Sequence, residues 1–286
     1  MNHVIVALEG GLGNQMFQYA AGRSASIRAG LPLALDLRPL LARGQRNYAL
    51  GDFLLGKNVE LIAEGVPPGS GRLSRLLRLI TGGGRTFREA GFPYDARIRS
   101  IATPVRLEGY FQSERYFSDI ADTLRADFAP GKEAMDEIGL LANRLLPAGP
   151  CVSLHVRRGD YANPETSAVH GLLGADYYAR ALQILAERTG RRLPVCVFTD
   201  DPAWARAHLP LPEEARFVSE HTRAPLQDLI LMSRCSHHIT ANSSFSWWGA
   251  WLNPHPEKVV VTPERWFQPA AGLDTRDLRP AGWLQT

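Results

Sequence analysis

Cysteine is scarce in this chain and never occurs in close pairs. The 286 residues include three cysteines, Cys151, Cys196 and Cys235, which lie far apart in apolar contexts. Zinc ribbons and thiol-redox centres use a Cys-x-x-Cys pair or a similarly close spacing. The sequence therefore predicts buried, reduced thiols and no metal site.

Long apolar runs and a large charge excess are also missing. No run approaches the ~18 residues that cross a bilayer, and no segment has the layout of a signal peptide. The formal net charge is +3, which is too small to argue for a nucleic-acid partner. A mild positive bias does suit a small anionic ligand.

The N-terminal half contains short apolar strands that alternate with a helix. A strand over Val4–Leu8 is followed by a glycine-rich turn, a helix over about Gln15–Arg28, and a second strand that ends at Asp36. This order opens a Rossmann-like unit.

The C-terminal half repeats the alternation. Strands over Val152–Val156 and Val195–Phe198 flank a helix around Tyr177–Arg188, which predicts a doubly wound parallel sheet. A linker near Pro147–Pro150 divides the halves. We therefore expect two α/β domains, residues 1–148 and 149–286, each near the usual domain size of about 150 residues.

The glycine-rich turn raises the alternative of a dinucleotide-binding dehydrogenase. Gly11 and Gly13 precede a helix, and Asp36 lies near the position of a ribose-binding acid. The fingerprint requires a third small residue, however, and this chain has Met16 there. Its side chain would obstruct the packing of the helix over a pyrophosphate, which disfavours the dehydrogenase.

Residues 65–90 differ in composition from their surroundings and predict an insert. Proline and glycine border a basic amphipathic stretch, Leu73–Ile80, and the arginines from Arg72 to Arg88 face one acid, Glu89. A solvated surface helix is the favoured interpretation. Peripheral contact with an anionic membrane through residues 72–88 is the alternative.

Two adjacent arginines, Arg157 and Arg158, follow the strand that begins the C-terminal half. Because successive strand residues point to opposite faces, His155 and Arg157 share one face and Arg158 lies on the other. One arginine can then meet a ligand while an acid braces its neighbour, with Asp160 as the nearest candidate. A planar guanidinium binds phosphate through two bonds. The alternative is a surface arginine pair bridged to Asp160.

Polar segments follow other strands of the predicted sheet and are expected to meet these arginines. Thr199–Asp201 follows one strand, and Asn242–Ser244 opens a helix rich in tryptophan. Ligands of such sheets bind beyond the carboxyl ends of the strands. We expect Asp201 to cap the helix that starts at Pro202. We expect the first turn of the tryptophan helix to bind phosphate, with the tryptophans in the core.

Three motifs together resemble the family 11 glycosyltransferases, the α1,2-fucosyltransferases. They are Gly10–Tyr19 (Gly-Gly-Leu-Gly-Asn-Gln-Met-Phe-Gln-Tyr), His155–Tyr161 (His-Val-Arg-Arg-Gly-Asp-Tyr) and Asn242–Leu252 (Asn-Ser-Ser-Phe-Ser-Trp-Trp-Gly-Ala-Trp-Leu). The stretch Tyr110–Phe117 strengthens the match. The motifs stand in the family's order, and the resemblance extends from Val4 to about Trp266.

The resemblance implies an α/β, GT-B-like fold of two Rossmann-type domains, with the donor site in the C-terminal domain. It implies transfer of fucose from GDP-fucose, with inversion, to a β-galactoside on a galactose-terminated glycan, without a bound metal or other cofactor. Animal and plant members carry an N-terminal membrane anchor that is not seen here, which favours a soluble bacterial-type enzyme in the cytoplasm, peripheral at the inner membrane if the insert binds there.

The resemblance also assigns residues. Asn14 and Gln15 are expected to face the cleft, and Asp200 to accept hydrogen bonds from guanine. The expected donor-binding residues are His155, Asp200, Asn242, Ser243, Ser244 and Phe245. The expected catalytic residues are Arg157, Arg158, Asp160 and Glu165.

The base that deprotonates the acceptor is expected on the loop after the arginines. Pairing with the arginines would lower the pKa of Asp160 and make it a weak base. Glu165 matches the acid suggested as base in the related α1,6-fucosyltransferases, and proton transfer to water alone is a further alternative. Two other activities stay open, namely transfer from another GDP-sugar and nucleotide-sugar binding without catalysis.

Overall fold

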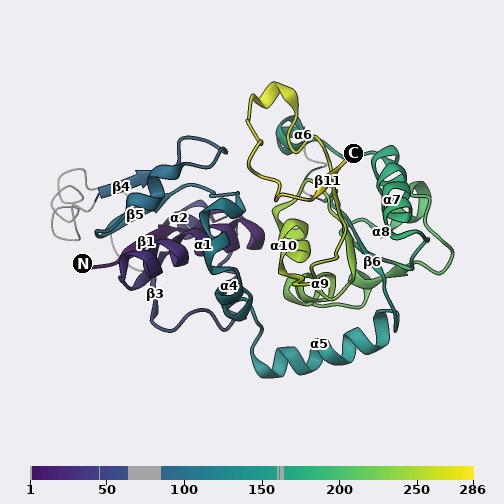
Figure 1. Ribbon diagram of the computed structural model, residues 1–286, viewed down its shortest axis with the longest axis horizontal. Coiled ribbons are helices and arrows are strands. Elements are labelled where there is room, and N and C mark those ends of the chain that lie inside the picture. The colour runs from purple at the N-terminus through teal and green to yellow at the C-terminus, as the bar shows by residue number, and fades with distance from the viewer. Residues whose placement is uncertain (1, 45, 64–84, 160, 162–163) are drawn as a thin grey trace. The chain divides into compact units, whose positions relative to one another are not determined.

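Two parallel sheets organise the chain, one in each of two units (Figure 1). This computed structural model describes residues 2–44, 46–63, 85–159, 161 and 164–286. Unit 1 comprises Met1–Ala129 and Asp274–Arg279, and unit 2 comprises Pro130–Leu273 and Pro280–Thr286. Two Rossmann-type units in one chain make the fold α/β and GT-B-like, as the sequence predicts.

Unit 1 is built on a five-stranded sheet in the order β3-β2-β1-β5-β4, with every neighbouring pair parallel. Because β1 lies between β2 and β5, the strand order changes direction at β1 and β5. The strands are β1 (Val4–Ala7), β2 (Leu33–Asp36), β3 (Val59–Ile62), β4 (Arg85–Arg88) and β5 (Val105–Glu108). The helices are α1 (Leu12–Ala29), α2 (Arg38–Arg43), α4 (Ala121–Asp127) and the 3-10 turns η1 (Ala96–Ser100), η2 (Glu114–Tyr116) and η3 (Ser118–Ile120).

Helix α1 begins three residues before the predicted start at Gln15. Gly11 is its N-cap, and the backbone N–H groups of Asn14 and Gln15 both donate to the Gly11 carbonyl. The glycines therefore form the first turn of the helix as well as the loop before it. Further along, α1 packs closely on β1 at Gly22, where a Cβ atom would lie 2.2 Å from Cγ2 of Val6.

The structure disfavours the dehydrogenase alternative, because its proposed ribose-binding acid, Asp36, is already paired within the protein. Asp36 is fully buried, and its carboxylate is bound by Arg38, with Nη2 2.7 Å from Oδ2, and by Arg106. Burial alone would raise the pKa of Asp36, but hydrogen bonds from the two arginines outweigh it and hold the pKa below its usual value. Asp36 therefore stabilises the sheet and has no role toward a ribose.

Part of the predicted insert belongs to the sheet. Residues 64–84, which include the basic stretch Leu73–Ile80, lie outside the described residues. Arg85–Arg88, in contrast, forms the edge strand β4 beside β5, and Arg88 pairs with Glu108 at 2.6 Å. The described end of the predicted insert is thus a strand of unit 1. Its apolar Phe87 stacks against Phe111 with 6.4 Å between ring centroids.

Unit 2 is built on a six-stranded parallel sheet in the order β11-β10-β9-β6-β7-β8. Read from β8, this is the 3-2-1-4-5-6 order of dinucleotide-binding folds, with the change of direction between β6 and β9. The strands are β6 (Val152–Val156), β7 (Val195–Thr199), β8 (Arg216–Phe217), β9 (His237–Ile239), β10 (Val260–Thr262) and β11 (Leu284–Gln285). The helices are α5 (Lys132–Leu145), α6 (Pro164–His170), α7 (Ala175–Thr189), α8 (Pro202–His208), α9 (Pro225–Ser233), α10 (Ser244–Leu252) and the 3-10 turns η5 (Val218–Glu220) and η6 (Pro269–Ala271).

The division between the units lies earlier than the predicted boundary at 148/149. Helix α5 belongs to unit 2, where the Arg234 guanidinium donates to the carbonyl of Ile138 at 3.4 Å and Arg216 donates to that of Leu145 at 3.2 Å. Residues 274–279 belong to unit 1, where Asp277 pairs with Arg115 at 2.7 Å. Proline and glycine near 147–150 mark the end of α5, and a loop of this kind need not separate domains.

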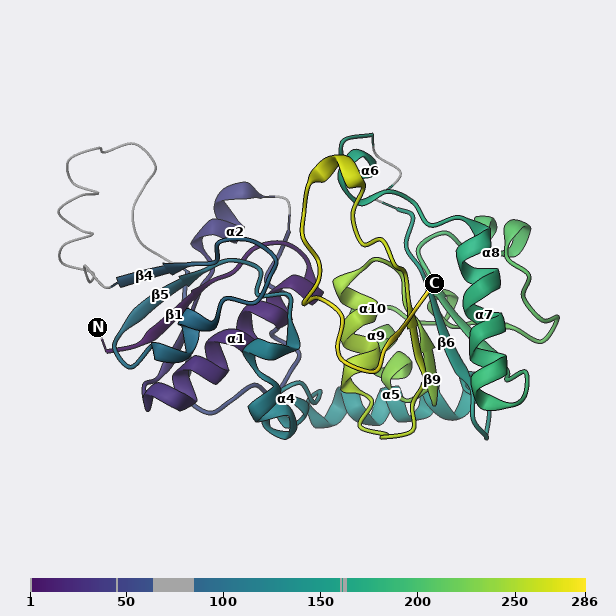
Figure 2. The ribbon, with the colours of Figure 1, turned by 45° about the horizontal axis from the view of Figure 1, so that its top comes forward.

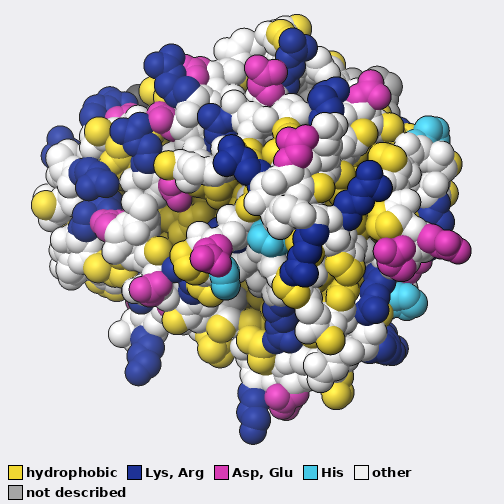
Figure 3. Space-filling view, turned by 45° about the vertical axis from the view of Figure 1, so that its right-hand side comes forward, with side chains coloured by type: hydrophobic (Ala, Val, Ile, Leu, Met, Phe, Trp, Pro, Cys, Tyr) yellow, Lys and Arg dark blue, Asp and Glu magenta, His cyan; other side chains and the backbone are white. Residues whose placement is uncertain are grey.

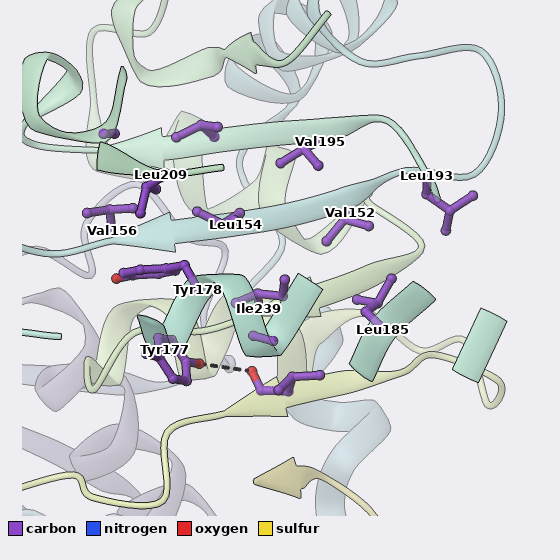
Figure 4. Close-up of a cluster of buried hydrophobic side chains, with 14 residues drawn as sticks. Val152, Leu154, Val156, Tyr177, Tyr178, Leu185, Leu193, Val195, Leu209 and Ile239 are labelled. Carbon is purple, nitrogen blue, oxygen red and sulfur yellow. Dashed lines mark hydrogen bonds between the residues drawn. The ribbon is translucent and has the colours of Figure 1, made fainter. Parts of the chain in front are cut away.

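One face of the unit 2 sheet packs against α7, as Figures 2 and 4 show. The alternate residues Val152, Leu154 and Val156 of β6 point to this face together with Val195 of β7. Tyr177 closes the cluster from α7, and its hydroxyl donates to the carbonyl of Thr240 at 2.5 Å. The other residues of these strands, His155 among them, therefore face α9 and α10.

Helix α10 is buried, as its all-round apolar sequence predicts. Trp247 and Trp248 are fully buried, and their ring centroids lie 5.0 Å apart. Trp251 lies 5.1 Å from Trp248. The tryptophans therefore fill the core, and their rings are not available to stack on a sugar.

Charged side chains of both signs are mixed on the face of the molecule that Figure 3 shows. On the face shown in Figure 3, Lys and Arg side chains are interspersed with Asp and Glu side chains. This distribution agrees with the net charge of +3.

Candidate active site

The two arginines after β6 are held by the two aspartates after β7. Nη1 of Arg157 lies 2.8 Å from Oδ2 of Asp200, and the backbone N–H of Arg158 donates to Oδ1 of Asp200 at 2.8 Å. Nε of Arg158 lies 3.4 Å from Oδ2 of Asp201. Because β6 and β7 are parallel neighbours in register, their carboxyl ends bring these four residues together. Asp160, the predicted brace, lies outside the described residues.

The loop of the arginines approaches Asp200 closely at Gly159. A Cβ atom there would lie 2.7 Å from Oδ2 of Asp200, the oxygen that binds Arg157. A side chain at residue 159 would therefore displace the carboxylate from the guanidinium.

The side chains of the two arginines diverge, as strand alternation predicts. The guanidinium of Arg158 lies 4.0 Å from the ring centroid of Trp204, which packs on the α7 side of the sheet. The guanidinium of Arg157 lies 5.8 Å from the ring of Tyr161 and remains partly exposed. Each arginine therefore has one aspartate and one aromatic ring as partners, and both side chains are partly exposed, with fractions of 29% for Arg157 and 20% for Arg158.

Asp201 has the predicted capping role. Its Oδ1 accepts the backbone N–H of Trp204 at 2.9 Å at the start of α8, and Pro202 follows it in the first turn. Both aspartates therefore use their carboxylate oxygens on neighbouring groups of the protein. Asp200 positions Arg157 in this structure, and its predicted contact with guanine stays a prediction.

His155 lies beside Arg157 and is neutral at pH 7. The imidazole is buried, with its ring centroid 5.7 Å from that of Phe245 at the start of α10. Burial, and to a lesser degree the charge of Arg157, lowers the pKa of His155 to about 3. A neutral imidazole offers one donor and one acceptor.

Asn242 connects loops at the end of β9. Its Nδ2 donates to the carbonyl of His170 at 2.9 Å and lies 3.3 Å from the carbonyls of Gly171 and Trp266. The hydroxyl of Tyr161 donates to the Asn242 carbonyl at 3.1 Å. Asn242 therefore anchors the loop after the arginines, while its Oδ1 remains for another partner.

Ser243 and Ser244 start α10 as predicted. The side chain of Ser243 accepts the backbone N–H of Phe245 at 3.4 Å and is the N-cap. Ser244 and Phe245 are half-buried. The positive end of the α10 dipole thus lies at the carboxyl edge of the sheet, next to β6, in a position that favours an anion.

Three buried polar atoms near the change of strand order have no hydrogen-bond partner among the described residues. They are Nδ1 of His155, Oγ1 of Thr240 and Oδ1 of Asn242. Buried polar groups are almost always hydrogen-bonded, so a cluster of exceptions requires an explanation. All three atoms are available to a polar ligand at the carboxyl edge of the sheet, where β6 and β9 are neighbours. Thr240 is a site residue that the sequence did not single out, because nothing distinguishes a threonine at a strand end.

In unit 1, Asn14 and Gln15 lie in the first turn of α1, which follows the carboxyl end of β1. Gln15 is fully buried, its Nε2 donates to the carbonyls of Gly10 and Asn47 at 2.9 Å each, and its Oε1 accepts the N–H of Ala49 at 2.9 Å. Gln15 therefore supports a loop, and its contact with substrate stays a prediction. Asn14 is half-buried and accepts a hydrogen bond from Gln112 at 2.9 Å.

A half-buried acid, Glu89, supports the strand end next to Asn14. Glu89 accepts the backbone N–H groups of Tyr110 and Phe111 at 2.9 Å each and the hydroxyl of Tyr116 at 2.9 Å. Phe111 has a positive φ of 54°, a conformation that needs such support. Burial raises the pKa of Glu89 although these hydrogen bonds oppose it.

The predicted base, Glu165, lies on the short helix α6, in the segment between the arginines and α7. The backbone places it in the second position of this seven-residue helix. Its side chain is not described, so its role stays a prediction.

Among the residues described, no helix is both long enough and apolar enough to cross a membrane.

Comparison with known proteins places the chain in a family. The profile of Glycosyl transferase family 11 matches residues 95–272. The chain is 34% identical to an alpha-1,2-colitosyltransferase of Escherichia coli over 303 residues, covering 100% of this chain and 99% of the relative. It is 29% identical over 311 residues to the O-antigen biosynthesis glycosyltransferase WbnK of E. coli, covering 97% and 98%.

A solved structure shows the same fold at low sequence identity. A mutant of Arabidopsis thaliana FUT1 in complex with GDP aligns with a TM-score of 0.53 and 13% identity, covering 99% of this chain and 76% of that chain. The three sequence motifs, the site at the carboxyl edge of the unit 2 sheet and the full-length relatives agree: the chain belongs to glycosyl transferase family 11 and is a glycosyltransferase.

Proposed function

We propose that this enzyme is an inverting galactoside α1,2-fucosyltransferase that transfers L-fucose from GDP-fucose to a β-galactoside hydroxyl. The observation that carries the proposal is the crevice between β6 and β9. It combines a partly exposed arginine, a helix N-terminus and three buried polar atoms that need a ligand. A nucleoside diphosphate sugar has the negative charge and the many polar atoms that such a crevice requires.

The diphosphate of the donor binds Arg157 and the first turn of α10. Arg157 is held by Asp200 at 2.8 Å, so its guanidinium keeps one orientation before the donor arrives. When the bond between fucose and GDP breaks, negative charge grows on the β-phosphate. A preorganised guanidinium stabilises that charge in the transition state more than in the ground state.

His155, Thr240 and Asn242 bind polar groups of the donor from the same edge of the sheet. Since His155 stays neutral, it forms hydrogen bonds without adding charge next to Arg157. Arg158 acts indirectly, through Asp200. Trp204 and Asp201 hold its side chain, and its backbone N–H donates to Asp200. Arg158 and Asp200 are thus positioning residues for Arg157.

The acceptor hydroxyl attacks the anomeric carbon from the side opposite GDP and loses its proton to a base or to water. We keep Glu165 as the base and Asp160 as a residue that positions the arginines. If Asp160 is instead the base, Asp160→Asn alone should abolish turnover while GDP binds normally. If Glu165 is the base, Glu165→Gln removes the acidic limb of the pH profile of kcat/KM.

GDP-colitose is a second candidate donor, because a relative of this chain is named a colitosyltransferase. The E. coli protein that is 34% identical over the full length is named a colitosyltransferase. Colitose is fucose without its 3-hydroxyl, so one crevice can accept either sugar. The linkage in that relative's name is α1,2, which supports the proposed linkage for both donors.

The decisive experiment offers GDP-fucose, GDP-colitose and GDP-mannose, each radiolabelled in the sugar, to an array of β-galactosides. The expected result is transfer from GDP-fucose with an α1,2 linkage in the product. If GDP-colitose is the preferred donor, the proposed donor is wrong. If the product has an α1,6 linkage, the proposed linkage is wrong. Binding of GDP without transfer from any donor would support a nucleotide-sugar-binding protein and contradict the proposal.

A further inference from the structure

The fold gathers all three cysteines of the chain at one point in unit 2. The Sγ atoms of Cys151, Cys196 and Cys235 all lie within 4.8 Å of one another. The three residues are buried, with exposed fractions of 3%, 0% and 1% respectively. Within the described ranges this is the only group of His, Cys, Asp or Glu with such spacing.

Strand alternation and pairing explain the convergence. Cys151 precedes β6, and Cys196 lies in β7 opposite Ser153. Their neighbours Val152 and Val195 point to the α7 face of the sheet (Figure 4), so both cysteines point to the face covered by α9.

Backbone bonds bring the third cysteine to the same place. Cys235 follows α9, and the N–H groups of the next two residues, Ser236 and His237, both donate to the Cys151 carbonyl at 3.0 and 3.2 Å. The Cys235 carbonyl accepts from Nδ2 of Asn253 at 2.9 Å. The cluster is therefore defined by three segments that are each fixed by other bonds.

The three thiols differ in how readily they lose a proton. Hydrogen bonds from Cys196 and Cys235 lower the pKa of Cys151, and the charge of Arg216 adds to this effect. The pKa of Cys196 is raised to about 12, chiefly through its hydrogen bond to Cys151.

We propose that Cys151, Cys196 and Cys235 form a three-sulfur site for a thiophilic metal ion of the class that includes Cu(I) and Zn(II). Thiolate sulfur selects these ions over Mg²⁺, Ca²⁺ and Mn²⁺, which prefer oxygen. Cu(I) is satisfied by three sulfur donors, whereas structural Zn(II) takes a fourth ligand. Binding displaces thiol protons, so affinity rises with pH.

The site is structural and separate from the proposed donor site. The cysteines lie toward the amino ends of β6 and β7, and Arg157 and Asp200 follow their carboxyl ends. Five strand residues span about 15 Å. A bound ion joins the start of β6, the start of β7 and the end of α9, and therefore stabilises the assembly of unit 2.

The test uses the full-length protein purified under reducing, oxygen-free conditions and stripped with a chelator. Cd(II), Zn(II) and buffered Cu(I) are added separately while ultraviolet sulfur-to-metal charge transfer and bound metal are measured. The expected result is saturation at one ion per chain with a rise in Tm of at least about 5 °C. Competition between Cu(I) and Zn(II) then identifies the preferred ion.

Variants separate coordination from packing. Cys196→Ala and Cys235→Ala should each weaken metal binding at least ~100-fold, whereas Ser153→Ala, on the same face of β6, should retain it. The proposal is overturned if stripped wild-type protein with three titratable thiols takes up none of the ions at one equivalent, or if charge transfer persists in both cysteine variants. The wild-type titration decides the matter if the variants fail to fold.

Discussion

Both units carry polar side chains where their parallel sheets change strand order, but the two units use these side chains differently. In unit 1, Gln15 makes all its hydrogen bonds to the backbone of its own unit, and Glu89 holds the loop after β5. In unit 2, Arg157 remains partly exposed, and buried atoms of His155 and Thr240 lack partners among the described residues. The polar groups of the unit 1 strand ends therefore bond mostly to one another, whereas those of unit 2 leave buried atoms available to a ligand.

The difference shows that strand topology alone does not locate a binding site. Both sheets offer a crevice at the change of strand order. The two sheets differ in whether the polar atoms at these strand ends already have hydrogen-bond partners. An unpaired buried polar group costs about 1–3 kcal/mol, so it favours binding of a group that satisfies it. Next to the half-buried Asn14, Oε1 of Gln112 is buried and has no hydrogen-bond partner among the described residues. These two residues are the candidates for contact with the acceptor.

Arg157→Lys should give the largest effect. Lysine keeps the charge but loses the planar fork that Asp200 orients, so kcat/KM should fall at least ~100-fold, or about 2.7 kcal/mol of transition-state stabilisation. Steady-state kinetics with saturating acceptor measures this.

A matched control is Arg206→Lys. Arg206 also pairs with a carboxylate, Glu220 at 2.6 Å, on the exposed surface of unit 2. Its substitution should leave kcat/KM within about twofold, since exposed ion pairs contribute little. Near-normal turnover of Arg157→Lys would contradict the proposed role of Arg157 at the donor diphosphate. It would also remove the proposed functional difference between the strand ends of unit 1 and unit 2.

Gln15→Ala should act on stability and not on the substrate. The substitution leaves the carbonyls of Gly10 and Asn47 and the N–H of Ala49 without their partner, at a cost of about 2–3 kcal/mol in the free energy of unfolding. Urea unfolding measures the loss. A raised KM for the acceptor with unchanged stability would show instead that Gln15 contacts substrate. Asn14→Ala, the neighbouring control, should raise that KM and change stability less.

Acid should destabilise unit 2 through His155. In the unfolded chain a histidine gains its proton below about pH 6.5, whereas burial delays protonation of folded His155 to about pH 3. The unfolded state therefore binds more protons in this window, and stability falls as the pH falls. From pH 7 to pH 5 the contribution of His155 is about 2 kcal/mol.

His155→Gln tests the source of this pH dependence. Glutamine stays neutral, so the loss of unfolding free energy between pH 7 and pH 5 should be smaller by about 2 kcal/mol. His238 has a similarly low pKa, also from burial, and should account for part of the remaining slope. An unchanged slope in His155→Gln would mean that His155 is protonated or exposed in the folded state.

Chelation should have the smallest effect on activity. Arg157 and the first turn of α10 supply the positive field that a divalent ion supplies in other transferases. We therefore expect EDTA to leave kcat within about twofold at 25 °C, while removal of an ion from the cysteine cluster lowers Tm. Loss of most activity that manganese restores would recast Asp200 and Asp201 as metal ligands.

The elements around the site could be predicted because each depends on local sequence. The alternation of apolar and polar residues predicts the strand Val152–Val156, and proline after an acid predicts the start of α8 at Pro202. The same periodicity predicts that Arg157 and Arg158 diverge. Two Rossmann-type units follow from repeated strand and helix alternation.

The remaining features depend on contacts between distant residues, which a single sequence does not encode locally. The brace of Arg157 lies 43 positions along the chain, at Asp200, since strand register decides which acid it meets. The cysteines meet through the same register. Likewise, α5 joins unit 2 through bonds to Arg216 and Arg234, and the composition of its following loop suggested a boundary that lies elsewhere.

The most direct test of the central claim, that the crevice between β6 and β9 binds the donor diphosphate at Arg157, is calorimetric titration of GDP and of guanosine. With wild-type protein and Arg157→Ala, GDP should bind at least ~10-fold more weakly to the variant, whereas the affinity for guanosine should not change. Equal weakening of both ligands, or unchanged binding of GDP, would contradict the account.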